Sequence, residues 1–175
     1  MCDTIPLEVI THQHDLILDV IGEIQRMMHG VELADVMANV ELRREVVARL
    51  ALLAEFVHEH CYMEQHAFLP ASRALGSVAK HQSLQDKLAT IEQRIQQFGL
   101  YAQGIVDHVR DPEAPALQTA KGWRIVLDFV RAAEAMIRRE DEVVIPFVER
   151  LTGHTSRRLR RPAPGIYSSP RPNAN

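Results

Sequence analysis

The chain has 175 residues, of which 46% are hydrophobic and 25% are charged, and its formal net charge is -3. This length suits one domain with a substantial core, and the composition is that of an ordinary soluble globular protein. No run of roughly 18 uncharged apolar residues is present to span a bilayer, and the N-terminal residues lack the basic and then apolar layout of a signal peptide. We therefore expect a cytoplasmic protein without membrane partners.

The charge is unevenly distributed along the chain. Residues 153–175 contain five arginines and no acidic residue, so the net -3 of the whole chain leaves about -8 for residues 1–152. An acidic domain is not typical of nucleic-acid binding, and we expect no nucleic-acid partner. The C-terminal segment is rich in Pro, Ser and Asn, which predicts a flexible basic tail after a single domain of residues 1–152. Cys2 and Cys61 form no CxxC pair or disulfide framework, and we interpret both as reduced.

The first half of the chain contains two segments with apolar residues spaced alternately three and four positions apart, the pattern of helices that pack in a bundle. The first segment covers about residues 7–29 and ends before Gly30, a good helix terminator. Its stripe is Ile10, His14, Ile17, Ile21, Ile24 and Met28. The second segment covers about residues 39–72, and its stripe is Val46, Leu50, Leu53, Val57, His60 and Glu64. Polar residues therefore interrupt both stripes.

The second half repeats this pattern. The third segment covers about residues 78–109, and its stripe is His81, Leu84, Leu88, Ile91, Ile95, Phe98, Ala102, Ile105 and Val109. After a break at residues 111–115, the fourth continues to about Leu151. Its stripe is Val126, Phe129, Ala133, Met136, Glu140, Val143 and Phe147. Short connections favour antiparallel neighbours, so the sequence predicts an all-α fold, an up-down-up-down antiparallel four-helix bundle.

The polar residues on the four stripes point to a metal site. In this topology the starts of the first and third helices and the ends of the second and fourth lie at one level, so the five polar residues can converge. They are His14, His60, Glu64, His81 and Glu140. One such residue alone is usually a structural residue with a hydrogen-bonding partner. Two buried carboxylates, however, repel each other unless a cation lies between them, and burial of each is costly unless it is paired or binds a metal.

The other histidines do not fit the stripes. Residues two positions apart on a helix point to nearly opposite sides, so His12 cannot face inward with His14, nor His58 with His60. We interpret the remaining histidines as surface residues or as residues that support the ligands from outside, a role best suited to His58 and His66: His12, His29, His58, His66, His108 and His154.

Two segments, HCYMEQHAFLP (60–70) and MIRREDEVVIP (136–146), superpose His60 on Met136 and Glu64 on Glu140, each followed six residues later by a proline. The helices therefore look like two related hairpins. The ordered set of a His, a His-x-x-x-Glu with its proline, a second His and a second x-x-x-Glu with its proline resembles the hemerythrin HHE cation-binding domain family. The resemblance covers roughly residues 7–151.

This resemblance implies a di-iron centre in which Glu64 and Glu140 bridge the metals and His14, His60 and His81 complete the ligand set. Imidazole with carboxylate suits iron, and also Mn or Zn. The family implies O2 or NO as a small diatomic ligand, a role in sensing, oxidative or nitrosative stress or iron-sulfur cluster repair, and a redox or iron-sulfur protein as partner. No nucleophile-base pair, phosphate loop or cofactor motif accompanies these residues, which favours a binding or sensing protein over an enzyme.

Met136 departs from the family pattern, because it stands where a fourth histidine would be and a thioether is a weak ligand for iron. Three outcomes stay open: an asymmetric di-iron site, a single-metal site, and a bundle that binds no metal and acts as a helical interaction module. A ferritin-like carboxylate oxidase would need Glu-x-x-His on two helices, and only Glu55 with His58 matches.

Overall fold

The computed structural model describes residues 7–68, 82–111 and 114–152, and within them every regular element is helical. The predicted all-helical class is confirmed. The α-helices are α1 (Leu7–Met28), α2 (Leu33–Ala38), α3 (Val40–Met63), α5 (Gln82–Val109), α6 (Ala120–Arg139) and α7 (Ile145–Thr152). Two π-helical segments, η1 (Glu64–Phe68) and η3 (Glu140–Val144), and one 3-10 segment, η2 (Pro115–Gln118), complete the set. No helix in these ranges is both long and apolar enough to cross a membrane.

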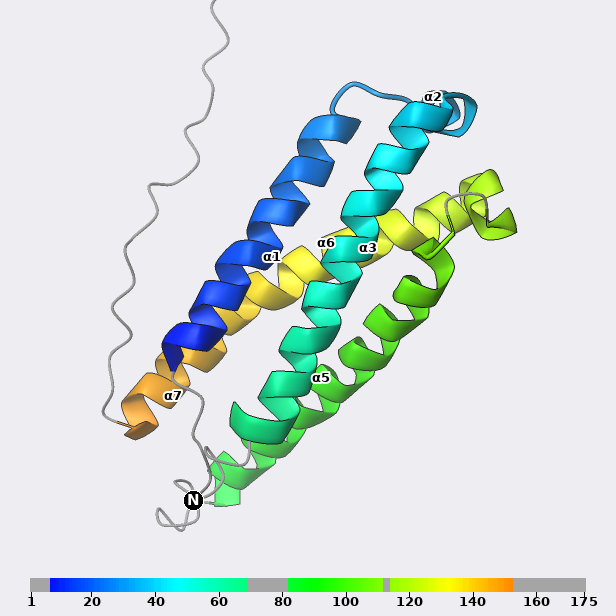
Figure 1. The fold of residues 1–175 in the computed structure, drawn as a ribbon. Coiled ribbons are helices and arrows are strands. Elements are labelled where there is room, and N and C mark those ends of the chain that lie inside the picture. The colour runs from blue at the N-terminus through cyan, green and yellow to red at the C-terminus, as the bar shows by residue number, and fades with distance from the viewer. Residues whose placement is uncertain (1–6, 69–81, 112–113, 153–175) are drawn as a thin grey trace, which may run out of the picture.

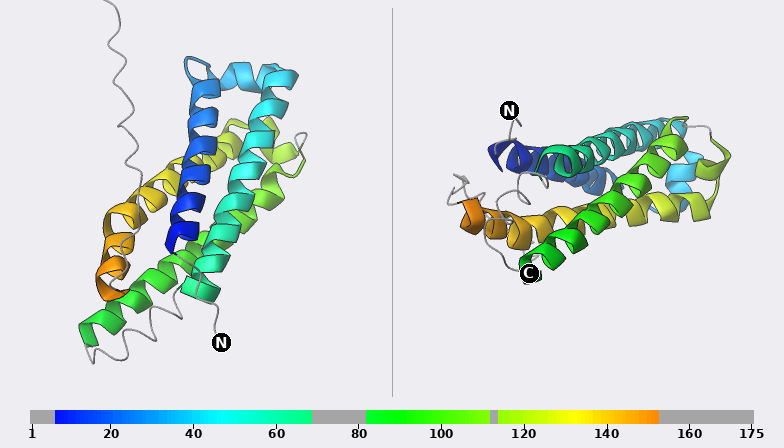
Figure 2. Two further views of the ribbon diagram at one scale, coloured as in Figure 1. Left: turned by 60° about the vertical axis from the view of Figure 1, so that its left-hand side comes forward. Right: turned by 90° about the horizontal axis from the view of Figure 1, so that it is seen from below.

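The long helices form two layers. Figure 1 shows α1 and α3 side by side and running in opposite directions, with the short α2 between them. Seen from below, α1 and α3 form one layer, and α5 and α6 with α7 form the other (Figure 2). The sequence pattern predicted neither α2 nor the π-helical segment that separates α6 from α7.

Local signals in the sequence fix where several of these helices begin and end. Gly30, with φ 72°, adopts the left-handed conformation that follows many helix ends and terminates α1. The Asn39 side chain accepts a hydrogen bond from the Leu42 backbone N–H at 3.1 Å, and this satisfies a free donor in the first turn of α3. Thr119 caps α6 in the same way through the Gly122 N–H.

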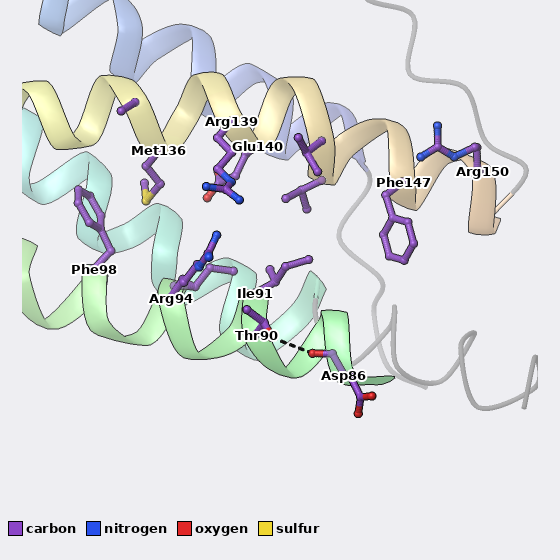
Figure 3. Close-up of a pocket in the computed structure, with 14 residues that line it drawn as sticks. Asp86, Thr90, Ile91, Arg94, Phe98, Met136, Arg139, Glu140, Phe147 and Arg150 are labelled. Carbon is purple, nitrogen blue, oxygen red and sulfur yellow. Dashed lines mark hydrogen bonds between the residues drawn. The ribbon is translucent and has the colours of Figure 1, made fainter. Parts of the chain in front are cut away.

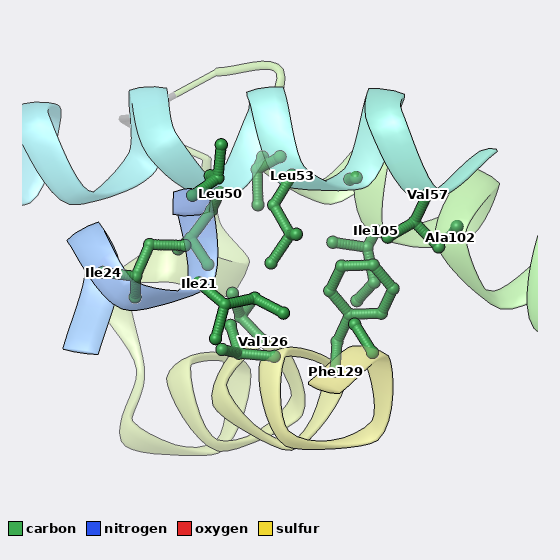
Figure 4. Packing of buried hydrophobic residues seen from close by; sticks show 14 of the residues in the cluster. Ile21, Ile24, Leu50, Leu53, Val57, Ala102, Ile105, Val126 and Phe129 are labelled. Carbon is green, nitrogen blue, oxygen red and sulfur yellow. The ribbon is translucent and has the colours of Figure 1, made fainter. Parts of the chain in front are cut away.

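The main core lies between the two layers, and all four long helices contribute to it. Figure 4 shows its central part, formed by Ile21, Ile24, Leu50, Leu53, Val57, Ala102, Ile105, Val126 and Phe129. Phe129 is fully buried, and its ring lies 5.9 Å from that of Phe98 and 5.4 Å from that of Tyr101. All of the residues labelled in Figure 4 belong to the stripes read from the sequence. Because they are apolar and buried between the layers, hydrophobic burial is the main force that joins the layers.

A second, smaller apolar cluster joins the start of α1 to η3 and the first half of α7. It consists of Ile10, Val144, Ile145 and Val148. The predicted stripe placed Val143 on the core face, and this was wrong: Val143 is 54% exposed and Val144 is 7% exposed. The reason is the π-helical segment η3, whose wider turn shifts the register of the following residues by about one position.

We expect Phe129→Ala to lower the free energy of unfolding by about 3–5 kcal/mol, because it removes a buried ring and leaves a cavity between the layers. Urea denaturation of the variant and the wild type measures this difference. Leu100→Ala is the control, since Leu100 on α5 is 71% exposed and its truncation should change stability by less than about 0.5 kcal/mol. Equal denaturation midpoints for the two variants would contradict this assignment of the core.

Candidate metal centre

Four buried polar side chains meet at one end of the main core. His14 comes from α1 and His60 from α3, while Glu64 and Glu140 are the first residues of the π-helical segments η1 and η3. All four are at most 5% exposed. The structure therefore brings together four of the five residues that the sequence singled out. The fifth, His81, lies outside the described residues, and its role stays a prediction.

One carboxylate oxygen forms the centre of this group. Glu140 Oε2 lies 3.1 Å from His60 Nε2 and 3.2 Å from His14 Nε2. Ligand atoms of these three residues all lie within 4.8 Å of one another. Glu64 Oε2 lies 3.4 Å from His60 Nε2, so the second carboxylate borders the same space. A single cation placed among these atoms would contact two imidazoles and a carboxylate.

Two further side chains orient the imidazoles, and the sequence pattern identified neither of them. Asp141 Oδ1 lies 2.6 Å from His14 Nδ1, and Gln13 Oε1 lies 3.1 Å from His60 Nδ1. Carboxylate and amide oxygens only accept hydrogen bonds, so each Nδ1–H donates outward and each Nε2 is directed at the centre. Metal-bound histidines are typically held in this way by a partner on the other ring nitrogen.

The electrostatics of the four buried side chains show what a bound cation would relieve. Burial, followed by the negative charge of Glu140, raises the pKa of Glu64 well above its ordinary value. Burial acts to raise the pKa of Glu140 as well, but the adjoining imidazoles of His14 and His60 outweigh it and lower that pKa. Burial opposes charge on His14, yet Asp141 and Glu140 together raise its pKa. Protons on His14 and Glu64 thus offset negative charge that a metal ion would otherwise neutralise.

Glu64 provides the clearest test of whether the residues fit a metal. Both of its carboxylate oxygens are buried and lack a hydrogen-bond partner in the described part of the chain. A buried carboxylate without a donor is costly, whereas coordination of a cation satisfies it directly. The donor set of imidazoles and carboxylates therefore fits a divalent metal.

The two glutamates of the site stand at matching positions of the two π-helical segments. η1 and η3 begin at Glu64 and Glu140, and they occupy the same positions in the two related sequence segments 60–70 and 136–146. A π-helical turn inside an α-helix is rare and is found mostly at functional sites. Its presence at both glutamates supports the predicted relation between the two helical hairpins.

The remaining histidines in the described ranges lie outside the buried site, as predicted: His12, His29, His58, His66 and His108. His154 and Cys2 lie outside those ranges. Cys61 is buried and free, and burial together with the charges of Glu64 and Glu140 raises the pKa of its thiol. It is therefore protonated at neutral pH, which agrees with its interpretation as a reduced residue.

A family model, the hemerythrin HHE cation-binding domain, matches residues 5–148. The chain belongs to the hemerythrin HHE family. No curated protein and no solved structure gives a significant match. The family match includes all five predicted ligand positions and ends before residues 153–175, the predicted tail, which also lie outside the described residues.

In this hemerythrin-family chain, Met136 lies one helical turn before Glu140. It is partly buried, packs against the main core and lines a groove between α5 and α6 next to Glu140 (Figure 3). Its thioether therefore has a packing role, and the imidazoles that the described part of the chain brings to the site come from α1 and α3.

In the metal-free protein we expect Glu64→Gln to raise the free energy of unfolding at neutral pH. A carboxyl group whose pKa is raised by folding loses its contribution to stability as the pH rises above its unfolded value, so the advantage of Gln should grow between about pH 5 and pH 8. The growth is at most about 1.4 kcal/mol per pH unit. Urea denaturation of chelator-treated protein across this range measures it.

Glu59→Gln is the matched control, because Glu59 is exposed on the same helix. Added metal should reverse the order of the two free energies of unfolding, because it should stabilise the wild type but not the Glu64→Gln variant. A Glu64→Gln protein that matches the control at every pH, with and without metal, would show that Glu64 is not the strained group of this site.

Proposed function

We propose that this protein is a non-haem iron-binding protein that binds or senses O2 or NO, within an antiparallel four-helix bundle of the hemerythrin type. The observation that carries the proposal is the convergence of His14 Nε2, His60 Nε2 and a Glu140 oxygen within 4.8 Å in a buried site. Two imidazoles with one carboxylate form a ligand set that is typical of non-haem Fe(II) and leaves coordination positions open. Bound iron would supply redox activity and a binding position for a small diatomic ligand.

The chain's own residues support this role in three ways. His14 and His60 present Nε2 because Asp141 and Gln13 hold their other ring nitrogens. Burial among apolar side chains limits the access of water to the site, since the smaller cluster around Ile10 and Val144 joins α1 to η3 and α7 at this end. No arrangement of nucleophile and base accompanies the site in the described residues, which favours binding or sensing over turnover. We place this function in the cytoplasm. A stress response or iron-sulfur cluster repair, with a redox or iron-sulfur partner, would use the same site.

The number of metals depends on Glu64. Its two oxygens border the space beside His60 and are available as ligands. We propose an asymmetric pair of irons, one held by His14, His60 and Glu140 and the other dependent on Glu64 and on His81. A single iron is the alternative if Met136 leaves the second position too weak.

A metal-free interaction module is the competing function. One observation favours it: Glu140 Oε2 lies 3.1 Å from His60 Nε2 and 3.2 Å from His14 Nε2, so protons on the imidazoles can satisfy part of the site. Glu64, with both oxygens lacking hydrogen bonds in the described residues, argues against it.

The test is to load the protein with Fe(II) under anaerobic conditions and record its visible absorption before and after exposure to O2 or NO. We expect new absorption bands with at least one gas and an iron content of one to two per chain. Glu140→Gln should remove both the bands and the iron. A spectrum that does not change with either gas would contradict a diatomic-binding function, and failure to retain any iron would favour the interaction module.

A further inference from the structure

A groove of about 810 Å³ lies between α5 and the continuous stretch from α6 to α7 (Figure 3). Its volume is in the range of pockets that hold small organic molecules, roughly 300 to 1,000 Å³. Most of the residues that line it are apolar, among them Ile91, Phe98, Met136, Val144 and Phe147. Such a lining suits an apolar ligand body.

The groove also exposes apolar surface that packing among the described residues does not cover. Val143 lines it and is 54% exposed, although the sequence pattern placed this side chain on the core face. The π-helical segment η3 turns Val143 out of the core and Val144 into it. The π-helical turn that begins at Glu140, a residue of the metal centre, therefore widens the apolar wall of the groove.

Positive charge faces the groove from both walls. Arg94 on α5 and Arg139 on α6 are exposed and extend toward each other across it (Figure 3). Arg150 lies farther along, near Phe147. Guanidinium groups bind carboxylates strongly through paired N–H donors, and two that face each other without an anion repel.

The sign and size of the charge narrow the ligand class. Three arginines line the groove, against two carboxylates, Asp86 and Glu140. Of these two, Glu140 is directed to the imidazoles of His14 and His60 and does not offset the groove's arginines. The excess of positive charge matches an anionic headgroup, and the two facing guanidinium groups can hold one carboxylate between them. The segment 153–175 does not complement the groove, because its five arginines carry the same sign.

We propose that the groove binds an amphipathic monocarboxylate, with the carboxylate between Arg94 and Arg139 and the apolar chain extending along Ile91 and Val144 to Phe147. The distance along the helix from Arg139 to Phe147 is roughly 12 Å at 1.5 Å per residue, close to the length of an extended decanoate chain. This site lies beside the metal centre but does not require a bound metal, so it goes beyond the proposed function.

Isothermal titration calorimetry of the full chain with decanoate, below its micelle concentration, tests the proposal. We expect saturable binding of one decanoate per chain. Binding should weaken at least tenfold in the double variant Arg94→Gln/Arg139→Gln, and each single variant should weaken it to a smaller extent. Arg131→Gln is the matched control and should bind as the wild type does, because Arg131 on α6 is 77% exposed and pairs with Asp128.

One control ligand and one variant distinguish this groove from nonspecific apolar binding and from the metal centre. Decanol, which has the same chain and no carboxylate, should bind at least tenfold more weakly than decanoate. Glu64→Gln should leave decanoate binding intact. The proposal is overturned by absent or non-saturable decanoate binding, by binding that the arginine variants leave unchanged, by equal binding of decanol, or by binding that Glu64→Gln abolishes, which would place the carboxylate on the metal.

Discussion

Two carboxylates, Glu64 and Glu140, lie in the apolar interior, and the cost of desolvating them is the constraint on which the surrounding structure depends. Glu140 is stabilised by His14 and His60, whose positive character lowers its pKa. Glu64 has no such donor in the described residues, and its pKa is raised by burial and by Glu140. Protons offset only part of the negative charge of these two carboxylates. The site is therefore most stable when a bound cation takes the place of the protons.

The fold meets this constraint by distorting helices locally rather than by opening the core. Both glutamates begin π-helical turns, which change the direction of the side chains that follow while the helix itself continues. At η3 the result is threefold: Asp141 reaches the His14 imidazole, Val144 joins the small apolar cluster with Ile10, and Val143 is left in the groove beside α5. One local feature therefore shapes both the groove and the support of a metal-site histidine.

Much of this arrangement could be predicted from the sequence. Helical spacing identified His14, His60, Glu64 and Glu140 as core-facing. Each of them occupies a position in a stripe whose other residues are mostly apolar, so the sequence itself shows a polar residue directed at the core. The same spacing failed after Glu140, since a constant 3.6-residue period cannot anticipate the extra residue of a π-helical turn. Asp141 and Gln13 were missed for a related reason: each is the direct neighbour of a core-facing residue, where a regular helix would direct a side chain away from the site.

The central claim is that the buried histidines and glutamates hold a metal ion, and elemental analysis of protein purified without chelator tests it most directly. His60→Ala and His58→Ala form a matched pair, because His60 is buried in the site and His58, two residues earlier on α3, is exposed. We expect at least one iron per chain in the wild type and in His58→Ala, and its loss in His60→Ala. Wild-type protein without metal, or equal metal content in the two variants, would contradict the claim that these buried side chains hold a metal ion.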